Sequence, residues 1–516
     1  MTPARIRAAF LPALLSALLA VGGCVANPVT GKKELVLIST ETEIETGREH
    51  YLPAQQAEGG RYTADAVLGE YVTFVGERMA AVSDRALPYQ FVVLNNSTPN
   101  AWALPGGKIA VNRGLLVELD NEAELAAVLG HEVVHAAARH GARAMQRDIL
   151  FSTIQLGVAL ASEDSKNADY AVGAAQLALG LTNLKYGRDA ERDSDYYGMK
   201  YMHAAGYDTA SAVTLQEKFV ALSKSRKDNW ISGLFASHPP SAERVADNRR
   251  ALATFPGGGM VGRARYREHL AHLLSRKDAY EQADRARELL DSDPRAALQT
   301  INAAIQKEPR EQLFHGIKGH ALAYQEHYQE ALRAYDTAIQ YDPHPGYYEH
   351  FLGRGLAYKN LGQNTRAQAD LERSNQLLPN VLANFHLGHI AAKKGDRENA
   401  KKYFLTAGDA GGEIGESAHR IFTMLDIADA PWRYVDAEIL FGEDELFIEV
   451  HNKTPYPLQH ISLGVNADIN GRTHRRKPSL ARLAPNAKKK ISGGVRYREE
   501  DEVEVGVEIL GAKIAN

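Results

Sequence analysis

The clearest hydrophobic pattern in the chain is a helical one between residues 121 and 138. Apolar and polar positions alternate there with a helical period, no proline interrupts them, and the only glycine is Gly130. His131 and His135 stand four residues apart in this predicted helix, so both imidazoles leave the same face one turn apart. The apolar residues on either side of the histidines indicate a buried helix and argue against an ordinary solvated one.

Stretches with strand-like composition precede this helix. Residues 89–95 are β-branched and aromatic and follow a proline, which predicts a strand. Residues 101–104 and 108–111, joined by the Pro-Gly-Gly turn at 105–107, predict a hairpin beside the helix. Trp102 in this hairpin could face a substrate, but an aromatic residue at such a position is more often part of the core.

From about residue 275 the pattern becomes a repeat. Alanines recur at intervals of 34, 36 and 33 residues, namely Ala297, Ala331, Ala367 and Ala400. An aliphatic or aromatic residue follows each alanine by four positions, and a proline follows the first three by twelve. This pattern is typical of tetratricopeptide repeats (TPR), and it predicts about four helix pairs stacked into a solenoid with a concave binding surface over residues 275–425.

Beyond about residue 431 the hydrophobic period changes to two. Five predicted strands, at 434–441, 445–452, 461–469, 490–497 and 502–509, indicate a small β-sandwich over residues 431–516. A positively charged run lies between residues 472 and 490. It could face anionic lipid, although such charges more often form a solvated face that keeps sheet edges from pairing.

Composition adds the broad class. The 516 residues predict about three domains, and a net charge of −4 with 24% charged residues is typical of a soluble globular protein without general nucleic-acid character. Cys24 is the only cysteine, which excludes an intramolecular disulfide and a thiolate metal cluster.

The position of Cys24 suggests a role for it. A start containing two arginines, an apolar run over 8–21 and the sequence Val-Gly-Gly-Cys resemble a bacterial lipoprotein signal peptide at residues 1–23, which would leave a lipidated Cys24. A plain signal peptide or a buried N-terminal helix are the alternatives. Val25 in place of an aspartate favours the outer membrane, by analogy with bacterial lipoproteins. We therefore expect a chain anchored to a membrane by lipid and not spanning it.

Candidate chemistry lies on the helix with the two histidines. Two imidazoles at this spacing can share one tetrahedral Zn²⁺ at ~2.0–2.1 Å. Glu132, one step round the helix, can take a proton from zinc-bound water and pass it to the leaving amine, as in the HExxH motif of zinc peptidases. A catalytic zinc needs a third protein ligand. Glu191 and Asp195 are also four residues apart, so one can complete the zinc shell while the other accepts the free N–H of a ligating histidine.

At these motifs the sequence resembles a known family. The Asn-Ala-Trp-Ala-Leu-Pro-Gly-Gly stretch at 100–107, HExxH with His140 five residues on, and the segment at 188–195 are similar to the HtpX-like zinc metallopeptidases. Within that family the match is to the periplasmic, repeat-carrying branch typified by the β-barrel assembly-enhancing protease, over roughly residues 27–247 and into the repeats.

The resemblance implies a set of roles for these residues. His131, His135 and Glu191 would bind one Zn²⁺ per chain, Glu132 would be the catalytic acid and base, and Asp195 would support a ligand from behind. The expected architecture is multidomain α+β. A mainly helical zinc peptidase domain with a small β-sheet (24–260) is followed by the TPR solenoid and the C-terminal β-sandwich.

Two further features concern access to the site. His238, in the His-Pro-Pro-Ser stretch at 238–241, could reach the zinc's open position and keep the enzyme silent; alternatively it caps the helix that begins near Ser241. The apolar segments 151–160 and 171–181 are too short to span a membrane and predict a helical pair over the site.

The leading interpretation is a zinc endopeptidase on the periplasmic side of the outer membrane. It would degrade misfolded or stalled envelope proteins, captured by the TPR array and by strand addition to the hairpin near the metal. The alternative is a TPR chaperone or adaptor for outer-membrane protein assembly, partnered with the β-barrel assembly machinery and carrying a mostly inhibited protease site.

Overall fold

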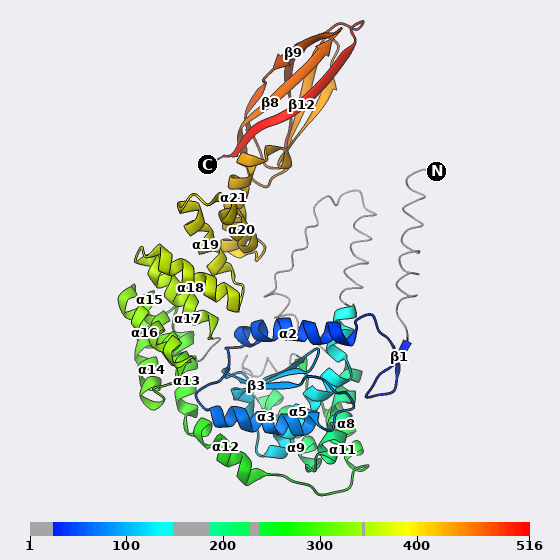
Figure 1. Cartoon of the computed structure of the whole chain (residues 1–516), viewed down its shortest axis with the longest axis vertical. Coiled ribbons are helices and arrows are strands. Elements are labelled where there is room, and N and C mark those ends of the chain that lie inside the picture. Colours follow the sequence, from blue (N-terminus) through cyan, green and yellow to red (C-terminus); the bar gives the residue numbers. More distant parts are fainter. Residues whose placement is uncertain (1–23, 148–185, 226–236, 343–345, 516) are drawn as a thin grey trace. The chain divides into compact units, whose positions relative to one another are not determined.

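The computed structural model of the chain describes residues 24–147, 186–225, 237–342 and 346–515, and is shown in Figure 1. The chain divides into two compact units, the first ending at Pro379 and the second beginning at Asn380. The predicted signal peptide and the predicted helical pair at 151–160 and 171–181 lie outside the described residues. Among the helices that are described, none is long and apolar enough to cross a membrane.

The first part of unit 1 is a mainly helical domain around a small sheet. Its strands are β1 (Cys24–Ala26), β2 (Lys33–Leu35), β3 (Gln90–Leu94), β4 (Ala101–Leu104) and β5 (Lys108–Asn112). Its helices are α2 (Thr40–Ala57), α3 (Ala66–Ala80), α4 (Arg113–Leu116), α5 (Glu122–Ala137), α8 (Arg188–Ala204), α9 (Ala210–Ser225) and α11 (Ala242–Leu252). The strand and hairpin expected at 89–111 are β3, β4 and β5.

The sheet has the order β3-β5-β4, with β3 parallel and β4 antiparallel to β5. Side chains alternate between its two faces. On one face Val92 and Trp102 pack beneath α2, and the Trp102 ring meets Tyr51 edge to face at 6.2 Å. On the other face Val93 and Ile109 join the core shared with α3 and α5. Trp102 is thus a core residue, only 3% exposed.

Helix α5 forms where the helical period predicts it. The side chain of Asn121 caps its first turn by accepting a hydrogen bond from the backbone N–H of Glu124. The helix is buried nearly throughout, with only His131 partly exposed. Gly130 and Gly198 bring α5 and α8 close together, since a Cβ on Gly198 would stand 3.3 Å from the backbone nitrogen of His131. The chemistry-bearing residues of both helices therefore meet.

The repeat region consists of paired helices, as the sequence predicts. After α12 (Arg263–Ser275), unit 1 continues with α13 (Lys277–Glu288), α14 (Pro294–Lys307), α15 (Gln312–Tyr324), α16 (Tyr328–Tyr341), α17 (Tyr348–Asn360) and α18 (Asn364–Leu377). Neighbours in sequence pack as hairpins. The repeated alanines are fully buried between them, and the Tyr335 ring packs against Gly319, where no Cβ would fit. The small residues therefore set the helix spacing.

Unit 2 begins with three helices and ends in the β-sandwich. The helices are α19 (Val381–Lys393), α20 (Arg397–Gly408) and α21 (Gly412–Asp429), followed by the short 3₁₀ helix η2 (Pro431–Arg433). The strands are β6 (Val435–Phe441), β7 (Glu445–Asn452), β8 (Leu458–Ile469), β9 (Arg472–Arg476), β10 (Ser479–Leu483), β11 (Lys488–Arg496) and β12 (Val503–Ile514). Helix α21 packs against β12.

The sandwich is built from two antiparallel sheets. One has the order β11-β7-β6; in the other, β8 pairs with β12 along one side and with β9 and β10 along the other. Inward residues of both sheets, such as Ile448 and Val465, form one apolar core. Strands β9 and β10 are absent from the sequence prediction, because β9 is polar at every position and neither strand alternates regularly.

Candidate metal centre

Four side chains converge where α5, α8 and the start of α11 meet. They are His131 and His135 on α5, Glu191 on α8, and His238 just before α11, and one potential ligand atom from each lies within 4.8 Å of the others. The Nε2 atoms of His131 and His135 are 3.0 Å apart, and Nδ1 of His238 is 3.0 Å from Oε1 of Glu191. The three predicted ligands and the predicted gate therefore form one cluster.

The cluster has the dimensions that a tetrahedral zinc site requires. Bonds of ~2.0–2.1 Å place neighbouring ligand atoms about 3.3 Å apart. The observed separations are similar: Oε1 of Glu191 lies 3.4 Å from Nε2 of His135, and Oε2 lies 3.6 Å from Nε2 of His131. Two imidazoles and a carboxylate are also a ligand set that zinc peptidases use. The residues present therefore fit a Zn²⁺ ion.

The two motif histidines are oriented by partners behind them. Oδ1 of Asp195 lies 3.0 Å from Nδ1 of His131, so this carboxylate can accept the Nδ1–H and leave Nε2 for a metal. Nδ1 of His135 faces Nδ1 of His140 at 3.0 Å. Burial lowers the pKa of His135 well below its ordinary value and the pKa of His140 to about 3. Neutral imidazoles are the form that binds metals.

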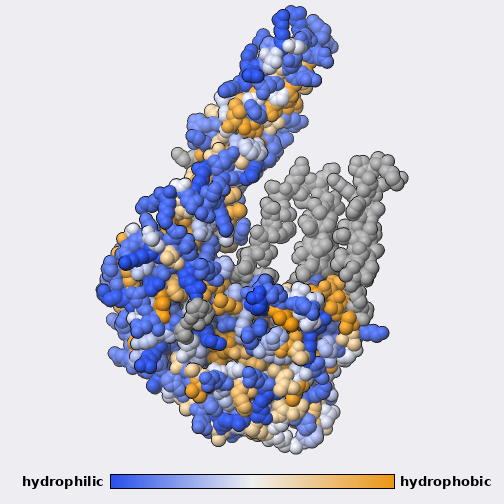
Figure 2. Space-filling model, viewed as in Figure 1, coloured by the Kyte–Doolittle hydropathy of each residue, from blue (hydrophilic) through white to orange (hydrophobic). Residues whose placement is uncertain are grey.

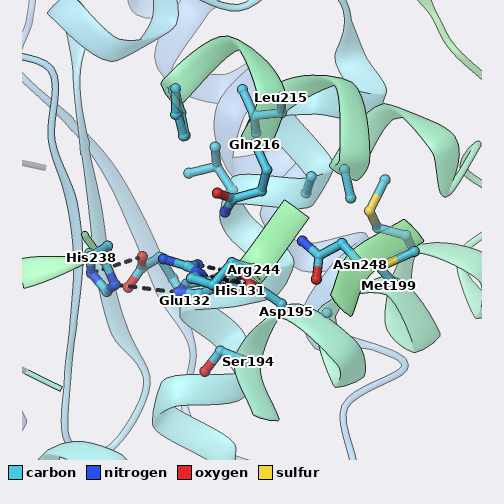
Figure 3. Close-up of a pocket in the computed structure, with 16 residues that line it drawn as sticks. His131, Glu132, Ser194, Asp195, Met199, Leu215, Gln216, His238, Arg244 and Asn248 are labelled. Atoms are coloured by element: carbon cyan, nitrogen blue, oxygen red, sulfur yellow. Dashed lines mark hydrogen bonds and ion pairs between the residues drawn. The ribbon is translucent and has the colours of Figure 1, made fainter. Parts of the chain in front are cut away.

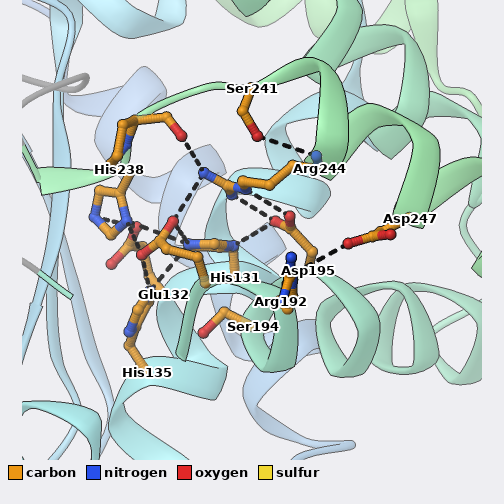
Figure 4. Close-up of polar contacts among 12 residues, drawn as sticks. His131, Glu132, His135, Arg192, Ser194, Asp195, His238, Ser241, Arg244 and Asp247 are labelled. Carbon is orange, nitrogen blue, oxygen red and sulfur yellow. Dashed lines mark hydrogen bonds and ion pairs between the residues drawn. The ribbon is translucent and has the colours of Figure 1, made fainter. Parts of the chain in front are cut away.

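Arg244 on α11 holds the acidic side of the cluster together (Figure 4). Its Nε and Nη2 donate to the two oxygens of Asp195 at 2.8 and 2.7 Å, and its Nη1 lies 2.9 Å from Oε2 of Glu191. Burial alone would raise the pKa of Asp195, but Arg244 keeps that pKa below its ordinary value. The same guanidinium donates to the backbone carbonyl of Pro239, next to His238.

The sequence interpretation did not assign a role to Arg244. The sequence gives only its position as an indication of a role. Arg244 stands three residues after Ser241, which ends the His-Pro-Pro-Ser segment and caps α11. A buried arginine is visible only once α8 and α11 are seen to pack together.

Glu132 lies beside the four ligand atoms and not among them. Its Oε1 is 3.6 Å from Nε2 of His238, and its buried Oε2 has no hydrogen-bond partner among the described residues. Burial raises the pKa of Glu132 above its ordinary value, an effect that His238 and His131 only partly offset. An unpartnered carboxylate oxygen with a raised pKa is suited to accepting a proton.

His238 is buried inside the cluster, only 6% exposed. Burial alone would lower its pKa, but the carboxylates of Glu191 and Glu132 face the ring and raise that pKa above its ordinary value. The cap of α11 is made by the Ser241 hydroxyl, which accepts from the backbone N–H of Arg244. His238 therefore points into the site and does not cap the helix.

A small cavity of about 50 Å³ lies next to Glu132 (Figure 3). Its apolar lining comes from α5, α8 and α9 and includes Val128, Met199 and Leu215. Strand β4, which forms one margin of the three-stranded sheet, packs against α5. The Tyr186 hydroxyl reaches the Ala103 carbonyl of this strand at 3.4 Å. The hairpin strand thus runs beside the helix that carries the cluster, as predicted.

The fold and the cluster together define a class of protein. A buried HExxH helix and a carboxylate ligand from a second helix are the arrangement of the HExxH metallopeptidases.

Comparison with known proteins gives the family. The model of peptidase family M48 matches residues 68–251, and a tetratricopeptide repeat model matches residues 382–407. Metalloprotease YcaL of Escherichia coli K12 is 31% identical over 35% of this chain and 70% of its own length. The chain belongs to peptidase family M48.

Two longer relatives match over less of their length. The putative beta-barrel assembly-enhancing protease of Vibrio cholerae is 27% identical, covering 41% of this chain and 45% of that protein. The beta-barrel assembly-enhancing protease of Escherichia coli K12 is 29% identical, over 36% of this chain and 39% of that protein. The chain thus spans less than half the length of these two relatives.

Proposed function

We propose that this protein is a zinc-dependent endopeptidase. The observation that carries the proposal is the convergence of His131, His135 and Glu191 on one point beside Glu132, whose Oε2 lacks a hydrogen-bond partner among the described residues. Zn²⁺ bound there would polarise the scissile carbonyl and lower the pKa of a bound water. The three ligands are those that the sequence predicts, and family membership supports them.

The chain's own residues divide the remaining steps among them. Glu132 takes the proton of the attacking water at Oε2 and returns it to the amine that leaves. Asp195 holds His131 through Nδ1, and Arg244 holds Asp195 and Glu191 in place. The backbone of β4 pairs with an extended substrate, which aligns the scissile bond with Glu132.

His238 is the proposed gate. Its Nδ1 lies 3.3 Å from Nε2 of His131 and 3.0 Å from Oε1 of Glu191, so the ring occupies space next to the metal ligands that a substrate carbonyl would need. In this arrangement the site is closed. Movement of the segment that contains Pro239 and Pro240 would open it.

The substrates we propose are misfolded or stalled proteins of the bacterial envelope. The repeat helices supply a surface for capturing them, and the relatives named beta-barrel assembly-enhancing protease support this setting. Cys24 is the first residue of β1 and the residue to which we propose an acyl chain is attached. We accordingly place the protein in the periplasm, held at the outer membrane as a lipoprotein.

The buried position of His238 favours one second candidate. A closed site suits a TPR chaperone or adaptor for outer-membrane protein assembly, working with the β-barrel assembly machinery, in which proteolysis is mostly inhibited. Such a protein would bind unfolded chains without cleaving them.

Cleavage of an unfolded protein separates the two candidates. We expect purified protein loaded with Zn²⁺ to cut reduced, unfolded casein, and a chelator to stop it. Glu132→Gln should retain zinc and fold but lose activity by at least about a hundredfold, because the proton acceptor is removed. Glu70→Gln, an exposed change in the same domain, is the control. Binding without cleavage under all these conditions would favour the chaperone.

A further inference from the structure

One stretch of the β-sandwich of unit 2 is strongly basic. The 25 residues from Arg472 to Arg496 contain nine lysines and arginines and no acid. They make up β9, β10 and β11 and the turns between them. These nine residues, here called the basic margin, are Arg472, Arg475, Arg476, Lys477, Arg482, Lys488, Lys489, Lys490 and Arg496.

The three strands lie along one edge of the sandwich. Strands β9 and β10 occupy the side of β8 that is opposite β12, and β11 is an outer strand of the other sheet. Strand β11 contacts both β9 and β10, and Arg476 joins the sheets by donating from Nε to the Gly494 carbonyl at 2.9 Å. In Figure 2 the end of the sandwich that carries β9 is covered largely by hydrophilic residues.

The opposite edge has the opposite charge. Strands β6 and β12 contact each other there. Together they carry four acids and one lysine, which are Asp436, Glu438, Glu504, Glu508 and Lys513. Charged side chains, lysine in particular, keep the edge strand of a sheet from pairing with another chain, which does not require the two edges to differ in sign. The difference in sign between these two edges goes beyond that need.

The basic margin is available to a partner. All nine side chains are exposed. Lys488 pairs with Glu449 at 2.9 Å, and Lys490 lies 4.0 Å above the centre of the Phe447 ring. Lys488 alone among the nine forms an ion pair with a residue that the structure describes.

We infer that the basic margin docks on the surface of a membrane containing anionic phospholipid. The nine residues of β11 extend over about 30 Å, a length that faces an array of headgroups and not one small anion. Attraction between clustered lysines and arginines and anionic lipid needs no fitted pocket. Single-stranded nucleic acid fits less well, because residues 472–496 contain no phenylalanine, tyrosine or tryptophan on which bases could stack.

The inference rests on the proposed function in one respect. The proposed acyl anchor at Cys24 places the chain at a membrane, and a basic surface elsewhere on the chain adds a second attachment to it. The second attachment would hold unit 2 on the lipid independently of the anchor.

Vesicle binding by the unacylated chain tests the inference. The chain from residue 24 onward, carrying Cys24→Ser, is sedimented with vesicles of phosphatidylcholine alone or with phosphatidylglycerol added. We expect binding only to vesicles with phosphatidylglycerol, weakening as salt rises. The triple variant Arg475→Glu, Arg482→Glu, Lys489→Glu should bind about a hundredfold more weakly. Arg263→Glu, Arg310→Glu, Arg333→Glu makes the same charge change at exposed positions of unit 1 and should bind as before.

Three results would overturn the inference: equal binding to neutral vesicles, undiminished binding by the triple variant, or binding to a nucleic acid but to no vesicle. If the triple variant does not fold, the same positions changed to glutamine provide the test. Zinc content and casein cleavage are measured on every variant. If the triple variant loses lipid binding but still cleaves casein, the effect is specific to the basic margin. If the parent chain does not cleave casein, the proposed function fails, and the lipid-binding result is judged separately.

Discussion

The surroundings of the residues in the metal cluster shift their pKa values in different directions. Burial keeps His135 neutral, which leaves its Nε2 free to bind a metal. Burial alone would raise the pKa of Glu191, yet His238, His135 and His131 hold it well below its ordinary value, so this carboxylate is ionised. Glu132 is shifted the opposite way. Two glutamates in one site thus acquire the two roles of ligand and proton acceptor.

His238 can be tested by a single substitution. If the ring blocks the site, His238→Ala should raise basal cleavage of casein several-fold and promote self-cleavage, with zinc content unchanged. Steady-state kinetics with metal analysis provide the measurement, and the exposed His203→Ala on α8 is the control. A lower kcat with zinc retained would show that His238 stabilises the transition state. Unchanged rates would leave it a structural residue.

Most of the site could be predicted from the sequence because it depends on short spacings. His131, Glu132 and His135 lie on one helix, and Glu191 with Asp195 on another, so helical geometry alone groups each set. Arg244 could not be found in this way. Its role depends on the packing of α11 against α8, which no local spacing encodes.

At the scale of elements, Arg244 connects α11 and the His238 segment to α8. Arg244→Ala would leave Asp195 and Glu191 buried without their cation, so we expect the free energy of unfolding to fall by about 3–5 kcal/mol. Zinc affinity should fall by about 10–100-fold, because the support of two ligands is lost. Thermal or denaturant unfolding and a zinc titration measure these effects.

The matched control is Arg250→Ala on the same helix. Arg250 forms an exposed ion pair with Asp247, so its removal should cost no more than about 1 kcal/mol. An effect of Arg244→Ala no larger than that of Arg250→Ala would show that the buried guanidinium does not hold the site together.

Helices and strands could be predicted from the sequence where their apolar and polar residues follow a regular period. Helix α5 and the repeat helices have clear helical periods, and β6, β7, β8, β11 and β12 alternate apolar and polar residues. Strands β9 and β10 could not be predicted, because β9 is polar at every position and β10 buries only Leu480 and Leu483. Their conformation is set by pairing with β8, a non-local contact.

At the scale of the whole molecule, the proposal joins a peptidase domain, repeat helices and a β-sandwich in one membrane-attached protein. Cys24 is the only residue in the chain suited to carrying an acyl group through sulfur. Cys24→Ser should therefore move the protein expressed in its bacterial host from the membrane fraction towards the soluble periplasm, as followed by immunoblotting of fractions at high salt. High salt removes attachment through the basic margin. A variant still wholly membrane-bound at high salt would mean that something other than acylation anchors the chain.

The central claim is that one Zn²⁺ is held by His131, His135 and Glu191. Native mass spectrometry of the zinc-reconstituted protein tests it most directly, by giving the number of ions per chain for the wild type, His135→Ala and the control His203→Ala. We predict one zinc per chain in the wild type and the control, and substoichiometric zinc in His135→Ala with the fold retained. Full zinc occupancy in His135→Ala, or none in the wild type, would contradict the assignment.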